Sequence, residues 1–165
     1  MKPARVLVFG VLLAFALMFV PNTTYINNES ALQAQDSLRS DVRAYLESKD
    51  SPLAPETAFL MEHKHWKLLI AISAIESQYC KRQLGWNCWG IGGDSAYRKY
   101  GSIREAIVDA DALIERWQKK GRWLTVDDMN CHYVQPCNPN WVIVVNKVLK
   151  QIDTYERTRY EQSSQ

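Results

Sequence analysis

The chain has 165 residues, of which 47% are hydrophobic and 23% are charged, and its formal net charge is +2. That length fits one domain with at most a small appendage, and the seven Gly and six Pro exclude collagen-like and low-complexity chains. Because 20 Lys and Arg nearly balance 18 Asp and Glu, the composition gives no indication of nucleic-acid binding.

The N-terminus predicts export from the cytoplasm. Lys2 and Arg5 precede residues 6–20, which carry no charged or polar side chain. A basic flank before 15 apolar residues is typical of an export signal or a short membrane anchor, since a full span usually needs about 20. No small-residue cleavage site follows directly, which favours an uncleaved anchor over residues 1–21. We therefore predict a membrane-anchored domain in the periplasm or outside the cell, or a secreted one if the signal is cleaved.

The rest of the chain predicts one mainly α domain. Residues 22–36 are polar without a clear period, which indicates a linker. Residues 37–155 show helical periodicity nearly throughout and predict five to six helices, whereas the polar tail 156–165 is expected to fray.

The first three helices differ in how apolar they are. The spacing of apolar residues in 38–46 predicts an amphipathic helix, and Pro55 is suited to open a second helix that ends near His63. Residues 67–77 leave no polar face, so this third helix should be central and buried.

A Gly-rich loop precedes the most regular helix of the chain. Residues 80–101 hold five of the seven Gly and indicate an irregular loop with a short hairpin. Ser102 and Glu105 form a capping-box pattern that starts the next helix, and Gly121 is placed to end it. A short helix is expected from Thr125, and Asn138 with the following Pro should cap the last helix.

Four cysteines outside the cytoplasm predict two disulfides. Three pairings are possible, and we favour the local ones, Cys80 with Cys88 and Cys131 with Cys137. Each would stabilise the fold by about 2–3 kcal/mol on the loop-entropy account. A zinc site is the alternative, but neither pair has the close spacing of zinc ligands and His132 is the only nearby imidazole.

Glu76 is the residue best placed for chemistry. It ends the most apolar helix and precedes the Gly-rich loop, where partial desolvation should raise the pKa of its carboxyl group. A carboxylic acid that stays protonated near neutral pH suits general-acid cleavage of a glycosidic bond. The alternative is a structural cap or ion pair near a helix end.

Three segments resemble the lysozyme-like superfamily, in particular the bacterial endo-β-N-acetylglucosaminidase and flagellar peptidoglycan-hydrolase branch. They are AISAIES at residues 71–77, NCWGI at 87–91 and YRKYGS at 97–102, and the resemblance covers about residues 40–152. It implies a lysozyme-like domain in which Glu76 is the general acid. The implied substrate is peptidoglycan or a related amino-sugar polymer, cleaved at β-1,4 bonds by a glucosaminidase, muramidase or lytic transglycosylase reaction.

The resemblance also implies residues that bind the glycan, which are Asn87, Trp89, Gly90, Tyr97 and Tyr133. For Trp89 the alternative is a buried plug that supports the loop, and for Tyr133 it is a place in the core. We expect no metal and no other cofactor. We also expect no nucleotide, because no phosphate-binding Gly motif is present.

A second catalytic carboxylate is the part of the pattern that the sequence does not place. Asp94, Asp127 and Asp128 are candidates, although capping or surface positions suit each of them better. Without such a group, the reaction would proceed with help from the substrate's own N-acetyl group or 6-hydroxyl. A non-catalytic, membrane-anchored glycan-binding module of the same fold is the competing prediction.

Overall fold

The computed structural model describes residues 23–93 and 96–163. The chain divides into two compact units, Met1–Gln33 and Ala34–Gln165, and only residues 23–33 of the first are described. The predicted membrane segment, residues 1–21, lies outside the described residues. In the part that is described, no helix has the length and apolar character needed to cross a bilayer.

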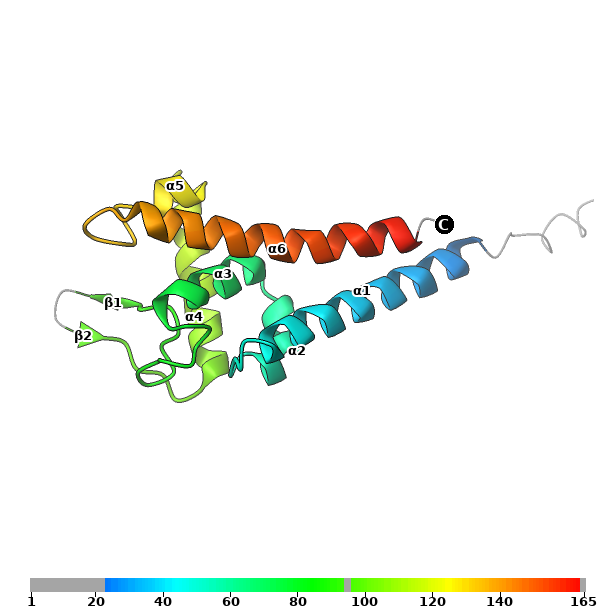
Figure 1. The fold of residues 1–165 in the computed structure, drawn as a ribbon, viewed down its shortest axis with the longest axis horizontal. Helices are drawn as coiled ribbons and strands as arrows, with labels where there is room; N and C mark the ends of the chain where they lie inside the picture. The colour runs from blue at the N-terminus through cyan, green and yellow to red at the C-terminus, as the bar shows by residue number, and fades with distance from the viewer. Residues whose placement is uncertain (1–22, 94–95, 164–165) are drawn as a thin grey trace, which may run out of the picture. The chain divides into compact units, whose positions relative to one another are not determined.

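The expectation of a mainly α fold is confirmed, with six α-helices and one short hairpin among the described residues (Figure 1). The elements are α1 (Thr23–Glu47), the 3-10 helix η1 (Ala54–Glu56), α2 (Thr57–Met61), α3 (Trp66–Glu76), β1 (Gly92–Gly93), β2 (Ala96–Tyr97), α4 (Ile103–Lys119), α5 (Val126–Met129) and α6 (Pro139–Ser163).

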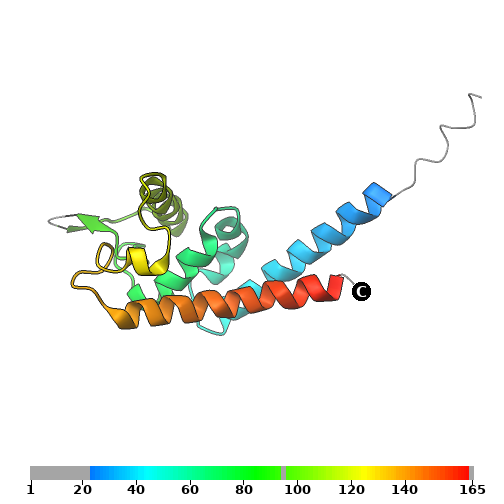
Figure 2. The same cartoon turned by 90° about the horizontal axis from the view of Figure 1, so that it is seen from above.

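The helix α3 is the centre of the second unit, as its uniformly apolar sequence predicts. Leu69, Ile70 and Ile72 are fully buried, and the most extensive contacts of α3 are with α6. Figures 1 and 2 show α6 running along α3 in both views. Each such side chain contributes about 1.5–3 kcal/mol when it leaves water, so this packing fixes the end of α3 where Glu76 lies.

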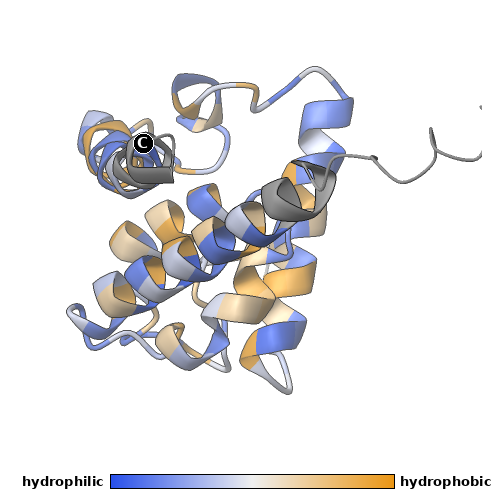
Figure 3. Ribbon diagram, turned by 90° about the vertical axis from the view of Figure 1, so that its right-hand side faces the viewer, coloured by the Kyte–Doolittle hydropathy of each residue, from blue (hydrophilic) through white to orange (hydrophobic). Residues whose placement is uncertain are grey.

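Hydrophobic residues of the other helices complete the core around α3. In Figure 3, orange segments gather on the helices at the middle of the view, with blue segments around them. Fully or almost fully buried residues of α1, α4 and α6 include Leu46, Ile107, Ile114, Val145 and Ile152.

The two long helices extend beyond the predicted limits. Residues 23–36, expected to be an irregular linker, are helical, and α6 continues to Ser163 although residues 156–165 were expected to fray. Once Val42 and Val145 hold their helices in the core, each further residue adds a hydrogen bond without a new nucleation cost. The polar sequences of these two segments alone therefore predict helices that are shorter than α1 and α6.

The helix α4 begins and ends largely as its sequence predicts. The Ser102 hydroxyl accepts the backbone N–H of Glu105 at 3.1 Å, but the Glu105 carboxylate accepts from Gly101 rather than from Ser102. Gly121 follows the helix with a left-handed φ of 69°, as expected of a residue that ends a helix.

The other predicted helix starts also carry caps. A complete capping box joins Thr125 and Asp128 at the start of α5. At the start of α6, the side chain of Asn138 accepts the N–H of Asn140 at 3.0 Å. The helix expected from Pro55 to His63 forms instead as η1 followed by α2, and ends at Met61.

Candidate functional site

Glu76 is the last residue of α3, and its side chain is half-buried. Burial raises the pKa of its carboxyl group, and a hydrogen bond from Trp141 opposes that shift without cancelling it. This direction is the one that the sequence predicts for a carboxyl group at the end of an apolar helix. The carboxyl group is therefore more readily protonated than an ordinary Glu, as a general acid requires.

Trp141 fixes one oxygen of this carboxyl group. Its indole Nε1–H donates to Oε1 of Glu76 at 2.7 Å, and its ring, at the start of α6, is 1% exposed. A hydrogen bond to the charged form of a carboxyl group stabilises that form. Trp141 thus orients the carboxyl group and keeps the rise in its pKa moderate.

Gly90 lies against the other oxygen. A Cβ atom placed on Gly90 would stand 3.0 Å from Oε2 of Glu76, and the φ of Gly90 is +63°. Both the close approach and the left-handed backbone favour glycine here. The carboxyl group thus lies between the indole N–H of Trp141 and the backbone of Gly90, which carries no side chain.

A cavity of about 180 Å³ lies beside Glu76. Three of the predicted glycan-binding residues line it together with Glu76. These residues are Asn87, Gly90 and Tyr97, and Arg82 and Leu84 complete the lining.

The backbone turns sharply after Glu76. Residues 78–80 have positive φ angles of 52°, 59° and 70°, a left-handed conformation that costs about 1–2 kcal/mol per residue. The N–H of Tyr79 donates to the carbonyl of Ser73 at 2.8 Å, which holds the turn against the helix end. This turn sends the Gly-rich loop back over the carboxyl group.

Both predicted disulfides are present, Cys80 with Cys88 and Cys131 with Cys137. The first pins the Gly-rich loop beside the turn. Ser77 reinforces it, because its buried hydroxyl donates to the carbonyl of Cys88 at 2.7 Å and accepts the N–H of Cys80 at 3.0 Å.

We expect Ser77→Ala to lower the free energy of unfolding by about 1–3 kcal/mol, because it leaves a buried N–H without its acceptor. Denaturant titration of the purified chain measures this loss. Ser48→Ala is the matched control, since its hydroxyl also donates to a backbone carbonyl but lies in the exposed turn that follows α1. An equal loss of stability in both variants would show that the hydrogen bonds between Ser77 and the loop contribute no more than an exposed side-chain hydrogen bond.

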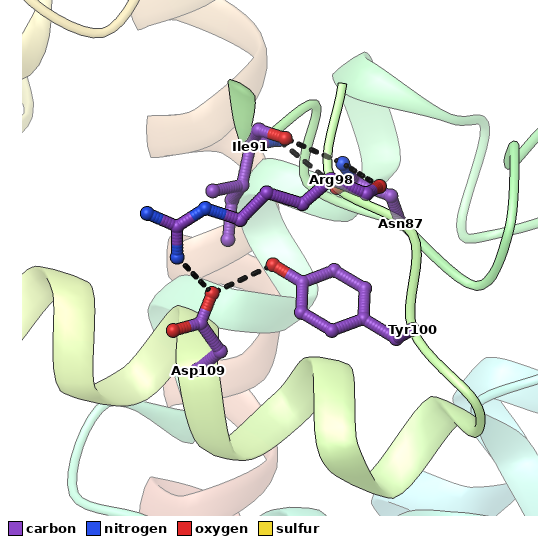
Figure 4. Close-up of polar contacts among 5 residues, drawn as sticks. All are labelled: Asn87, Ile91, Arg98, Tyr100 and Asp109. Carbon is purple, nitrogen blue, oxygen red and sulfur yellow. Dashed lines mark hydrogen bonds and ion pairs between the residues drawn. The ribbon is translucent and has the colours of Figure 1, made fainter. Parts of the chain in front are cut away.

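Asn87 holds the loop rather than offering free polar atoms. Its amide nitrogen donates to the carbonyls of Ile91, at 2.6 Å, and Arg98, at 3.0 Å, while its oxygen accepts the N–H of Ile91 at 2.9 Å (Figure 4). Asn87 is 5% exposed. Its part in the site is therefore to shape the cavity wall.

A second polar cluster ties this loop to α4. One carboxylate oxygen of Asp109 accepts both the guanidinium of Arg98, at 2.6 Å, and the hydroxyl of Tyr100, at 2.7 Å (Figure 4). Burial, followed by the bond to Asp109, raises the pKa of Tyr100 above its ordinary range. The YRKYGS segment thus positions the far strand of the loop.

Trp89 does not line either cavity at this site. Its side chain is 1% exposed, and its Nε1–H donates to the carbonyl of Leu69 at 2.8 Å. The predicted contact between the Trp89 ring and a sugar does not fit this burial, because the ring has no surface to offer. The alternative, a buried plug that supports the loop, fits it.

Tyr133 lines a second cavity of about 390 Å³, which also borders Gly90. Its ring packs between those of Trp123 and Trp141, and its hydroxyl donates to the carbonyl of Trp89. Burial and then the charge of Glu76 raise the pKa of Tyr133 well above its ordinary value. Tyr133 therefore lines the second cavity as an uncharged side chain.

Among the described residues, neither cavity contains an acidic side chain other than Glu76. Asp128 is engaged in the capping box of α5, and Asp127 belongs to the same short helix. Asp94 lies outside the described residues. Likewise, no cluster of three or more potential metal ligands occurs where the structure is described.

Sequence reasoning misses the role of Trp141. Its contact with Glu76 joins residues 65 positions apart in the chain, a relation that no local sequence pattern reveals. Trp117 and Trp123, which line the second cavity, were also not singled out. The excess of six Trp was the only signal, and it carries no information on position.

Comparisons of this chain with protein-family models, with curated proteins and with solved structures found no match.

The indole bond gives a testable pH effect. We expect Trp141→Phe to raise the pKa of Glu76 further, because the lost N–H stabilised the charged carboxylate. If Glu76 donates a proton in catalysis, the alkaline limb of the rate profile should move to higher pH. Trp66→Phe, a Trp replacement at the other end of α3, is the control and should leave the limb in place. An unmoved limb in Trp141→Phe would contradict this role.

Proposed function

We propose that this protein cleaves β-1,4 bonds between the amino sugars of peptidoglycan, with Glu76 as the general acid. The single observation that carries the proposal is the setting of the Glu76 carboxyl group. It is half-buried, has a raised pKa, is oriented by Trp141 and lies beside a cavity. The resemblance of three sequence segments to the lysozyme-like superfamily supports the same function.

In the proposed reaction, Glu76 transfers its proton to the glycosidic oxygen as the bond from that oxygen to the sugar carbon breaks. The carbon then accepts an oxygen nucleophile, which is water in hydrolysis and the sugar's own 6-hydroxyl in a lytic reaction. In the hydrolytic case, the substrate's N-acetyl oxygen can first trap the carbon. The released proton returns to Glu76, so the carboxyl group is restored.

The proposed setting is the outer side of the cytoplasmic membrane. Two disulfides support an oxidising compartment, since such bonds persist outside the cytoplasm. The apolar run at residues 6–20 supports an N-terminal anchor on sequence grounds. A domain held there would meet cell-wall glycan directly.

The experiment that tests this function incubates the purified full chain with insoluble peptidoglycan and then separates the pellet from the supernatant. Soluble glycan fragments in the supernatant, increasing with time and enzyme concentration, are the expected result. An intact pellet that carries no bound protein would overturn both cleavage and glycan binding.

A non-catalytic glycan-binding module is the second candidate, favoured by the lack of another acidic residue among the described lining of the two cavities. In the same experiment, this candidate predicts protein bound to the pellet with no release of fragments. It further predicts that Glu76→Gln binds the pellet as strongly as the unchanged chain.

A further inference from the structure

The second cavity differs from the first in its volume and in the residues that line it. It is about twice the volume of the first, at about 390 Å³ against about 180 Å³, and Gly90 lines both. A polymer that places its scissile bond at Glu76 can therefore extend past Gly90 into this larger space.

Cationic side chains dominate the polar part of this cavity. Arg116 comes from the last turn of α4, Lys120 directly follows that helix four positions later, and Arg98 comes from the loop. Arg98 is already paired with Asp109 (Figure 4), whereas no ion pair joins Arg116 or Lys120 to a carboxylate in the described part of the chain. No Asp or Glu among the described residues lines the cavity. Arg116 and Lys120 thus border the cavity without a carboxylate partner where the structure is described, and the ammonium of Lys120 lies over the Trp117 ring, 5.0 Å from its centroid.

Aromatic rings form the apolar wall of the same cavity. Trp117, Trp123 and Tyr133 all line it, with ring centroids 5.3 Å and 5.5 Å apart in succession. The same row continues through Trp141, whose ring lies 5.6 Å from that of Tyr133 and whose N–H binds Glu76. Trp123 and Trp141 are 5% and 1% exposed, so only the half-buried rings of Trp117 and Tyr133 offer surface to a ligand in this cavity.

We propose that this cavity binds an amino sugar that carries a carboxylate, with its ring against Trp117 and Tyr133 and its carboxylate on Arg116 and Lys120. The inference rests on the proposed function and specifies its substrate: an acidic amino-sugar polymer is preferred over a neutral one. Half-buried aromatic rings suit the apolar faces of a sugar, and two cations without a carboxylate partner suit an anion on its edge.

The two cations are exposed, which sets the size of the effect. Exposed ion pairs are weak, so we expect the two together to give about a tenfold preference for the acidic ligand, which corresponds to about 1.4 kcal/mol. The preference should weaken as salt concentration rises, because exposed charges are screened.

The test measures binding rather than cleavage, using the full chain with Glu76→Gln so that the ligand stays intact. The ligands are soluble peptidoglycan fragments with free carboxylates and the same fragments with their carboxylates converted to amides. We expect about tenfold tighter binding of the acidic form at low salt. Arg116→Gln with Lys120→Gln should remove that difference, so that the acidic and amidated forms bind with similar affinity.

Lys119→Gln with Lys147→Gln is the matched control, because it removes the same charge from exposed positions that do not line the cavity. This pair should retain the preference. Equal binding of acidic and amidated fragments by the parent chain would overturn the inference, as would equal loss of preference in both double variants. Equally tight binding of poly-glutamate would also overturn it, since the cavity would then be a general polyanion surface.

The two proposals fail separately in these experiments. A chain that releases fragments from peptidoglycan but binds acidic and amidated ligands equally retains the proposed function and loses the inference. A chain that releases nothing, yet prefers the acidic ligand through Arg116 and Lys120, retains the binding preference and loses the cleavage reaction.

Discussion

Glu76→Gln is expected to reduce the rate of glycan cleavage by a factor of about 100 to 10,000, the usual contribution of a general acid. The amide has nearly the same shape as the carboxyl group and can still accept the N–H of Trp141. It cannot transfer a proton to the leaving oxygen. The comparison is made on soluble peptidoglycan fragments by counting new chain ends over time.

Glu115→Gln is the matched control for this variant. Glu115 lies on α4, where it pairs with Lys119 across one helical turn and lines neither cavity beside Glu76. Its replacement changes the charge by the same amount and should leave the rate within about twofold, as surface changes away from a site usually do. A rate equal to that of the parent chain in Glu76→Gln would remove the general acid from the proposal.

Stability measurements distinguish a loss of proton transfer from a loss of folding in Glu76→Gln. Because the folded state raises the pKa of Glu76, its favourable contribution is present below the pKa of the unfolded chain and is lost as pH rises through the folded pKa. Gln resembles the protonated form at every pH. Glu76→Gln should therefore match the parent chain in acid and become the more stable of the two as pH rises through that interval.

Gly90→Ala is expected to have the second largest effect, at least a tenfold loss of cleavage rate. The new Cβ would stand 3.0 Å from Oε2 of Glu76, so the carboxyl group must shift against its bond to Trp141. Small displacements of a catalytic group cost large factors in rate. The left-handed backbone adds a loss of about 1–2 kcal/mol in stability.

Gly121→Ala isolates the backbone part of that effect. Gly121 has nearly the same φ, +69° against +63°, but a Cβ placed there meets no atom within 4 Å. Both variants should lose similar stability in denaturant titrations, whereas only Gly90→Ala should lose activity. Equal rates in the two variants would show that the contact between Gly90 and Glu76 does not position the acid.

The local features of this fold were readable from the sequence because local rules set them. The apolar run of α3, the Ser102 cap of α4 and the two short-range disulfides each depend on residues close together in the chain. The extent of α1 and α6 was not readable, since it depends on how each helix is held in the core.

For the candidate site, the sequence singles out Glu76 but not its surroundings. Glu76 is distinguished by its place at the end of an apolar helix, whereas the contacts of Trp141 and Gly90 with it require the folded chain. Trp89 shows the converse limit, because an aromatic residue in a loop can be a sugar platform or a buried plug. Only its burial decides between the two roles.

The most direct test of the central claim is mass spectrometry of a defined peptidoglycan fragment after incubation with the purified full chain and, in parallel, with Glu76→Gln. The account predicts shorter fragments from the unchanged chain, each with one new end that has either gained a water or closed as an anhydro sugar, and almost none from the variant. An intact fragment in both reactions, or the same shorter fragments in both, would contradict it.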